Sequence, residues 1–344
     1  MKKTQSDKTG GFEDFGEFLD AVKRVHIDSQ SDGRIDDLRA KVMTIGTDSS
    51  GGVLVPEQFA EEIFAHAIEE SVVMSKAFIQ PMKTDKVNMP RLRDADRSSN
   101  MFGGVSFNWL TETADRSTNE ASPAVAELEL EANNGVATAY VSNNLIADAY
   151  DFAAFFRYAF GKTVGFYVDA AAFNGTGNGQ PLGVIPSGAA IAVSRSSANK
   201  VDMVDLKNLA KRFSPSGWRR GDLFINQEVI PQFFELQSEA ANSVSVVNLM
   251  TRKFFGIDVV PTEYIPALGT KGDVVLADFS QYVIGKRSLV ISASGHVPDY
   301  FQANKTLWKI EVRIDGQPAV DAAYTPYKGS STVSPFIVLD DPTG

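Results

Sequence analysis

The stretch from Lys83 to Pro123 constrains the fold more than any other part of the sequence. It is polar, has no helical periodicity, and contains Gly103, Gly104 and many Ser, Thr, Asn and Asp residues. A connection much longer than about 12 to 15 residues without packed structure is uncommon in a compact domain. The embedded segments VNMPRL, VSFNWL and AELELEA have the composition of strands, so we predict a long, protruding two-stranded ribbon. Because such a ribbon is only marginally stable alone in water, we expect it to lie on another chain.

The first fifty residues predict an arm. Apolar residues recur at helical spacing among charged ones, which indicates an amphipathic helix over roughly residues 12–27. The residues on this stripe include Phe12, Phe15 and Phe18. The following stretch, Ser29 to Ser50, is polar and rich in Asp and Ser, which favours an extended linker over a packed element. The apolar stripe of the helix therefore needs a partner to cover it.

The longest helix is predicted near residues 151–174. Asp151 is suited to cap its N-terminus, and Asn174 with Gly175 is suited to end it. Its predicted buried stripe comprises Phe152, Phe155, Phe156, Ala159, Phe160, Val164, Tyr167, Val168 and Ala171. Within it, Gly161 and Gly165 each cost up to about 1 kcal/mol relative to Ala, so they mark either close packing or a bend.

The remaining sequence indicates an α+β domain. A helix is expected after Pro56, and from Ile185 onward short helices such as MVDLKNLAKRF alternate with strands such as DLFIN, IDVVPT and DVVLAD. Near the end, two strands around Asp315 and Gly316 predict a hairpin. The tail STVSPFIVLDDPTG adds one more strand, which Pro335 places at a sheet edge.

Composition excludes several classes of function. The net charge of -10 argues against binding nucleic acid through a broadly basic surface. The absence of cysteine excludes disulfides, thiolate zinc sites and cysteine nucleophiles. The three histidines are far apart, and the sequence contains no membrane-length apolar run, P-loop or GxSxG elbow. The first residues lack an apolar core of signal-peptide length, so we expect none there. We therefore expect no catalytic, cofactor-binding or metal-binding site and no membrane partner.

From Gly51 onward, the sequence resembles the major capsid proteins of tailed bacteriophages, which have the Hong Kong 97-like fold. The similar segments follow one another in order: GGVLVP, VNMPRL with FNWLTE, VSNNLIADA, DAAAFNGTGNGQPLGV, FFGIDVVPTEYIP, GDVVLADFSQYVIGKR and RIDGQPAVDAAY. They span nearly all of residues 51–330. Each motif consists of a few common residues, so the shared order carries the resemblance.

The resemblance implies a division of the chain into named parts. It places an N-terminal arm at 1–50, a peripheral domain at 51–82, 126–185 and 295–318 with its spine helix at 151–174, an extended loop at 83–125, an axial domain at 186–294 and 319–330, and a C-terminal tail at 331–344. The implied contacts between subunits involve Arg91, Arg93, Arg97, Phe102, Trp109 and Glu112 in the loop, and Phe12, Phe15 and Phe18 in the arm.

The implied function is that of a virion protein assembled in the host cytoplasm. Its subunits would form hexamers and pentamers that close an icosahedral shell around double-stranded DNA, bound non-specifically. A scaffolding protein and a portal are expected partners, a decoration protein is a further one, and the arm itself is an alternative scaffold. Some relatives crosslink through a lysine in the loop, but the distal part here carries arginines, so we predict no such crosslink. The alternatives are an encapsulin-like compartment of the same fold and a hydrolase of unrecognised type.

Overall fold

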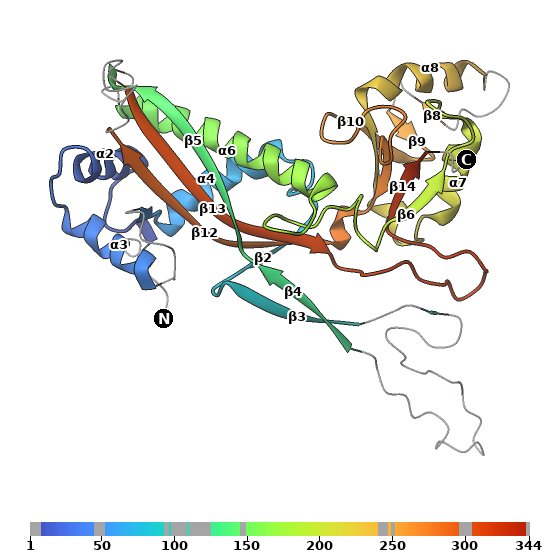
Figure 1. The fold of residues 1–344 in the computed structure, drawn as a ribbon, viewed down its shortest axis with the longest axis horizontal. Coiled ribbons are helices and arrows are strands. Elements are labelled where there is room, and N and C mark those ends of the chain that lie inside the picture. Colours follow the sequence, from blue (N-terminus) through green and yellow to red (C-terminus); the bar gives the residue numbers. More distant parts are fainter. Residues whose placement is uncertain are drawn as a thin grey trace.

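The computed structural model describes residues 8–44, 52–92, 96–97, 109, 125–144, 149–239, 247–248, 252–295 and 305–341. Two lobes lie side by side, each built on a β-sheet, and a thin ribbon leaves the molecule between them (Figure 1). The first lobe contains a five-stranded sheet and the long helix α6, and the second contains a seven-stranded sheet. The predicted α+β class is therefore confirmed.

Helix α6, Ala149–Asn174, spans the first lobe. At 1.5 Å per residue its length is about 39 Å. It begins two residues before the predicted cap, so Asp151 lies in its first turn. The chain leaves it through a tight turn in which Gly177 and Gly179 adopt positive φ angles of 76° and 68°.

Two glycines bring α6 against the backbone of α4, Glu57–Glu70. A Cβ atom on Gly161 would lie 2.9 Å from the carbonyl oxygen of Ile63, and one on Gly165 would lie 2.7 Å from that of Ala67. Both distances are too short for any side chain, so these residues mark close packing, one of the two predicted explanations. Phe59, Ile63 and Ala67 are buried on one face of α4, the helix expected after Pro56.

The sheet of the first lobe is built on two long antiparallel strands, β12 and β13. The strands of this sheet are β1 Val53–Leu54, β2 Phe78–Pro81, β5 Asn133–Ser142, β12 Tyr282–Ser294 and β13 Lys305–Pro318. Their order is β1-β12-β13-β5, and β2 also pairs with β12. Residues 282–294, which the resemblance assigned to the axial domain, thus form the central strand β12 of the first lobe's sheet.

The hairpin expected at Asp315 and Gly316 is absent, because β13 runs straight through both residues. The carboxylate of Asp315 accepts hydrogen bonds from the backbone N–H of Glu131, at 2.8 Å, and from the side chain of Asn133, at 3.3 Å. Gly316 leaves room for a ring, since a Cβ there would lie 2.8 Å from Cε1 of Tyr282. Tertiary contacts therefore hold Asp315 and Gly316 in a strand, although this dipeptide is typical of a turn.

The second lobe contains a mixed sheet in the order β6-β14-β11-β7-β10-β9-β8. Its strands are β6 Ile191–Ser194, β7 Asp222–Asn226, β8 Val247–Asn248, β9 Lys253–Phe254, β10 Ile257–Thr262, β11 Val274–Ala277 and β14 Phe336–Asp340. Its helices are α7 Met203–Arg212 and α8 Ile230–Glu239, and short 3-10 turns cover Gly217–Arg219, Gln227–Val229 and Phe279–Gln281.

The C-terminal strand β14 lies inside this sheet, between β6 and β11, and not at an edge. Pro335 directly precedes the strand, so it removes no hydrogen bond from either ladder, and its carbonyl oxygen accepts a bond from the N–H of Asp278 at 2.9 Å. The side chains from Phe336 to Leu339 are fully buried. The predicted tail is thus part of the second lobe's core.

Candidate inter-subunit surfaces

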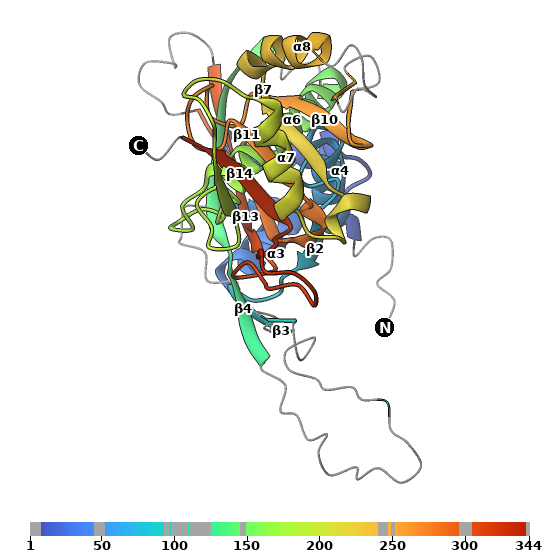
Figure 2. The ribbon, with the colours of Figure 1, turned by 90° about the vertical axis from the view of Figure 1, so that its right-hand side faces the viewer.

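The ribbon consists of strands β3, Lys86–Leu92, and β4, Val125–Glu131. The two strands are antiparallel, with Lys86 opposite Glu131 and Leu92 opposite Val125. The described part of the chain thus confirms a two-stranded ribbon, and Figure 2 shows it extending away from the body.

The base of the ribbon packs on its own subunit. Leu128 and Leu130 point to one face, as their alternation with glutamates predicts, and are buried against Met82 and Val283. This contact corrects the expectation that the ribbon finds its apolar partner only on another chain. The anchor fixes where the ribbon leaves the body.

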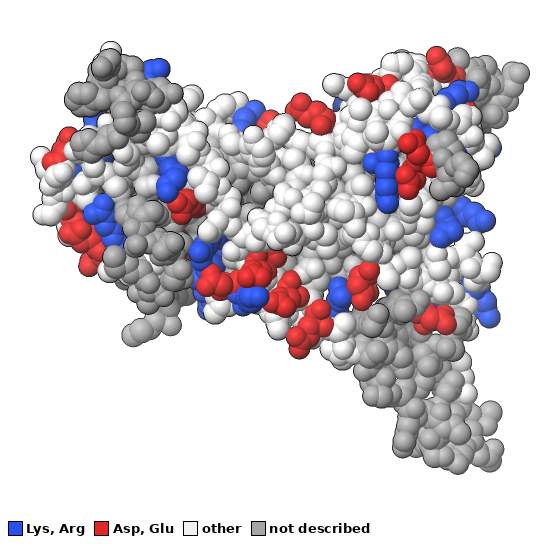
Figure 3. Space-filling model, in the orientation of Figure 1, with Lys and Arg blue, Asp and Glu red and all other residues white. Residues whose placement is uncertain are grey.

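The opposite face of the ribbon is acidic. Three glutamates of β4 alternate with the buried leucines, and Figure 3 shows acidic side chains gathered over β3 and β4. The ammonium group of Lys86 lies 3.1 Å from the carboxylate of Glu129 and 3.0 Å from that of Glu131. Hydrogen bonds to Glu131 and Glu129 raise the pKa of Lys86. Such exposed ion pairs contribute little to stability, so this face is available for contacts with polar or basic groups.

The expected contact residues of the loop fall into three groups. Arg91 and Arg97 contact the chain's own residues near 321–325, as described below. Trp109 is 91% exposed. Arg93, Phe102 and Glu112 lie outside the described residues. Large exposed aromatic side chains are typical anchors of protein interfaces, so a contact of Trp109 with another subunit stays a prediction.

The three phenylalanines expected to contact other subunits are instead core residues. Helix α2, Phe15–His26, packs on α4 and α6, and its N-terminus is capped by Asp14. Phe12, Phe15 and Phe18 are all at most 3% exposed. The Phe15 ring lies 5.5 Å from that of Phe59 and 6.0 Å from that of Phe156. The apolar stripe thus finds its cover within the same chain, which corrects the expectation of an arm without its own core.

The expected linker is also wrong, because residues 33–44 form helix α3, Gly33–Thr44. Ile35, Leu38 and Val42 are buried on it. Their spacing of three and four residues is a helical signal that the polar composition concealed. Arg34 fixes α3 to α2 through an ion pair of 2.8 Å with Glu17.

A set of exposed aromatic side chains on α6 and β5 was missed from the sequence. Phe155 and Tyr167 were expected in the buried stripe, yet they are 47% and 68% exposed. Tyr158 and Tyr140 are exposed as well. Aromatic residues occur around most of the helix, whereas α4 and the sheet cover only part of it. Neighbouring residues such as Phe155 and Phe156 point about 100° apart, so both cannot face one core.

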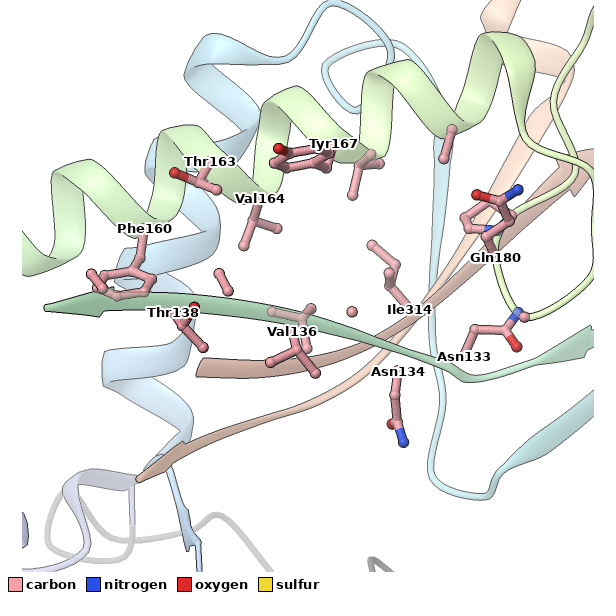
Figure 4. Close-up of a pocket in the computed structure, with 18 of the residues that line it drawn as sticks. Asn133, Asn134, Val136, Thr138, Phe160, Thr163, Val164, Tyr167, Gln180 and Ile314 are labelled. Carbon is pink, nitrogen blue, oxygen red and sulfur yellow. The ribbon is translucent and has the colours of Figure 1, made fainter. Parts of the chain in front are cut away.

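A hollow of about 560 Å³ lies between α6 and β5. Figure 4 shows Phe160 and Val164 pointing from α6 towards Val136 and Thr138 of β5, with Gln180 near one end. The lining is mainly apolar with amides at that end. Together with the exposed aromatic residues, it forms a surface suited to an apolar partner.

The described residues carry no constellation that suggests catalysis or metal binding. They contain no group of three or more His, Cys, Asp and Glu residues placed to hold a metal. The ring of His26 bonds the carbonyl of Val22 at 2.9 Å, and His66 lies 3.4 Å from Glu69. His296 is outside the described residues. Among the helices that the structure describes, none is both long and apolar enough for a bilayer.

Comparison with known proteins identifies the family. The model of the phage capsid family matches residues 51–329, and no curated protein sequence matches the chain significantly. The capsid of a native GTA particle superposes with a TM-score of 0.58 at 14% identity, over 81% of this chain and 90% of that one. A chain of Microbacterium phage Oxtober96 superposes with a TM-score of 0.54 at 15% identity, over 88% of this chain and 98% of that one. A chain of Mycobacterium phage Cain superposes with a TM-score of 0.51 at 18% identity, over 80% of this chain and 91% of that one.

At these identities the structural likeness shows the fold alone, whereas the family match covers most of the sequence. The order of elements also agrees with the expected spine helix and ribbon. The chain therefore belongs to the phage capsid family and is a structural protein of the capsid with the Hong Kong 97-like fold.

Proposed function

We propose that this chain is the major capsid protein of a tailed phage and assembles through hexamers and pentamers into an icosahedral shell around double-stranded DNA. The observation that carries the proposal is the ribbon. Its base is anchored by Leu128 and Leu130, whereas Val125, at the outer end of β4, is 63% exposed in the described subunit. A two-stranded ribbon gains stability when a second surface covers it. A neighbouring subunit in a shell provides such a surface.

The exposed aromatic residues support many contacts per subunit. Phe155, Tyr158 and Tyr167 on α6 and Trp109, which lies between β3 and β4 in the sequence, are large side chains of the type enriched at the centres of interfaces. We expect each subunit to bury more area than the about 1,600 Å² of a standard binary interface. Shell stability then comes from several modest contacts and not from one tight one.

The DNA is expected to be held without sequence recognition. The chain has a net charge of -10, which gives no broad basic surface for phosphates. Packaging does not require one, because a motor can supply the work of confinement. A scaffolding protein and a portal are the proposed partners during assembly in the host cytoplasm, and a decoration protein is a proposed partner of the finished shell.

An encapsulin-like compartment, which encloses cargo enzymes, is not favoured by the match to the phage capsid family. Negative-stain electron microscopy of the purified protein, produced alone and with its neighbouring genes, tests the proposal. DNA-filled heads that carry portals support it. Closed shells that hold protein cargo and no DNA favour the compartment. A stable monomer with turnover on a substrate favours the hydrolase alternative.

A deletion tests the role of the ribbon. We expect a variant that lacks residues 98–116 to remain folded and to form no shells. A control that replaces the same residues with an equally long Gly/Ser segment separates the loss of length from the loss of side chains such as Trp109. Intact shells from the deletion variant would refute the assigned role of the ribbon.

A further inference from the structure

The loop of residues 319–334 is fixed to the second lobe. Tyr324 and Val333 exchange two backbone hydrogen bonds, of 2.9 Å and 2.8 Å, and this pairing closes the loop. At its end, Ser334 donates to the carbonyl of Arg212 at 3.1 Å, and the guanidinium of Arg212 donates to Oγ1 of Thr332 at 2.7 Å. Because Arg212 ends α7, the loop is bound to that helix at two points.

The same loop contacts the ribbon beyond its base. The guanidinium of Arg91 lies 3.2 Å from the carboxylate of Asp321. The backbone N–H of Arg97 donates to the carbonyl of Thr325 at 3.0 Å, and Asp96 forms a β-bridge with Thr325. The guanidinium of Arg97 also lies 3.8 Å from the centre of the Tyr324 ring. An ion pair, backbone pairing and a cation–π contact therefore meet at one place.

We propose that the 319–334 loop is an intramolecular latch that sets the direction of the ribbon before assembly, with Asp321, Tyr324 and Thr325 as positioning residues. The base of the ribbon fixes where it leaves the body, and the latch holds it at a second point. Two points define a direction, whereas one allows the ribbon to swing. The latch also couples the ribbon to the lobe that carries α7.

The contacts are individually weak, which suits a latch that biases a direction without locking it. Arg91 and Asp321 are both partly exposed, so water and salt screen their attraction. A ribbon already pointing in the docking direction loses less conformational freedom when a neighbour binds it. Weakening the latch should therefore hinder assembly, although the subunit stays folded. The consequence for assembly rests on the proposed function, whereas the latch itself is a property of the single subunit.

Disulfide trapping tests the latch in isolated subunits. The chain has no cysteine, so the double variant D96C/T325C contains one pair only. Residues paired across neighbouring strands lie about 5 Å apart, within the Cα separation that a disulfide allows. We expect mild oxidation to link the two sites within one chain, as peptide mass spectrometry can show. D96C/K328C, with its second cysteine beyond the bridge in the same loop, is the matched control. Equal trapping in both variants, or none in D96C/T325C, would overturn the latch.

Shell formation then tests its direction-setting role. We expect Asp321→Asn and Arg97→Gln to raise the protein concentration needed for shells by about threefold to tenfold, and oxidised D96C/T325C to assemble at least as readily as the wild type. If Asp321→Asn and Arg97→Gln assembled better than the wild type and oxidised D96C/T325C failed to assemble, the latch would inhibit assembly. That result would overturn the proposal. If the wild type forms no shells at all, the proposed function fails, while the trapping result still decides whether the latch exists.

Discussion

The carboxylate of Asp169 in α6 accepts a hydrogen bond of 2.8 Å from the backbone N–H of Val72, which lies 97 residues earlier in the chain. The same carboxylate accepts bonds from the N–H of Val73, at 3.2 Å, and from the hydroxyl of Ser71. It therefore caps the turn that follows α4 and holds it to the spine helix. Burial raises the pKa of Asp169 to about 6, although these hydrogen bonds oppose the rise.

The raised pKa predicts a specific pH dependence of the folding free energy. Protonated Asp169 is favoured in the fold, so its contribution is fully present below the ordinary value of 3.8 and is lost as the pH rises through about 6. The loss amounts to at most about 3 kcal/mol, because one pKa unit corresponds to about 1.4 kcal/mol. Asp169→Asn cannot ionise, so its free energy of unfolding should change less between pH 4.5 and pH 7.5 than that of the wild type. Urea unfolding at these two pH values, which lie about one to two units below and above the pKa, measures the difference.

Exposed Asp37 on α3 provides the control for that measurement. Asp37→Asn should keep the pH dependence of the wild type. If Asp169→Asn also follows the wild-type curve at both pH values, the carboxylate does not titrate as argued.

The close approach of α4 and α6 predicts that Gly165→Ala is destabilising. A Cβ there would lie 2.7 Å from the carbonyl oxygen of Ala67, which is backbone and cannot rotate away. Overpacking of this kind costs about 1–3 kcal/mol and outweighs the gain of about 1 kcal/mol in helix propensity. Gly33→Ala at the start of α3, where nothing lies within 4 Å, is the control and should be close to neutral. Thermal unfolding compares the two, and equal melting temperatures would contradict the packing argument.

A buried ion pair in the second lobe gives a larger predicted effect. The guanidinium of Arg195 lies 2.8 Å and 2.9 Å from the two carboxylate oxygens of Asp273, and both side chains are fully buried. Removing one partner leaves an uncompensated charge, so Arg195→Met should cost about 3–5 kcal/mol. Lys253→Met, which breaks the exposed pair with Asp258, should cost no more than about 1 kcal/mol. Urea unfolding midpoints check both values, and a neutral Arg195→Met would show that packing replaces the pair.

The absence of covalent crosslinks is a prediction about mature shells. Lys86 lies between two glutamates at the base of the ribbon, and the distal residues Arg91, Arg93, Arg97 and Arg116 are arginines. A guanidinium stays protonated at any physiological pH and is therefore a poor nucleophile for isopeptide formation. A denaturing gel of mature shells should show one band at the size of the monomer. A ladder of oligomers would overturn this expectation.

The sequence predicts those elements whose signals are local. The strands DLFIN and IDVVPT, the spine helix and the ribbon are found as predicted, because apolar periodicity and composition act within each segment. The wrong predictions concern residues whose structure depends on contacts with residues distant in sequence. Asp315 and Gly316 have the composition of a turn, yet the N–H of Glu131 and the ring of Tyr282 keep them in a strand.

The inter-subunit surfaces were predicted less well, for the same reason. An amphipathic stripe such as that of Phe15 and Phe18 shows that something covers the helix, but not whether the cover is the same chain or another. The reverse error concerns Phe155 and Tyr167, whose apolar rings suggested burial although no described element of the subunit covers them fully. The apolar pattern of a helix predicts that another surface covers it, and only the tertiary arrangement shows which surface that is.

The interior position of β14 predicts that the C-terminal segment is required for folding of the second lobe. Deleting residues 336–344 removes the strand between β6 and β11 and four fully buried apolar side chains, Phe336 to Leu339. Each such side chain contributes about 1.5–3 kcal/mol, so the summed loss is comparable to the about 5–15 kcal/mol that stabilises a typical domain. We expect this variant to lose the cooperative unfolding transition of the lobe and its protection in hydrogen exchange. Deleting only residues 342–344, beyond the strand, should leave both unchanged, and a wild-type urea midpoint for the longer deletion would show that β14 is dispensable.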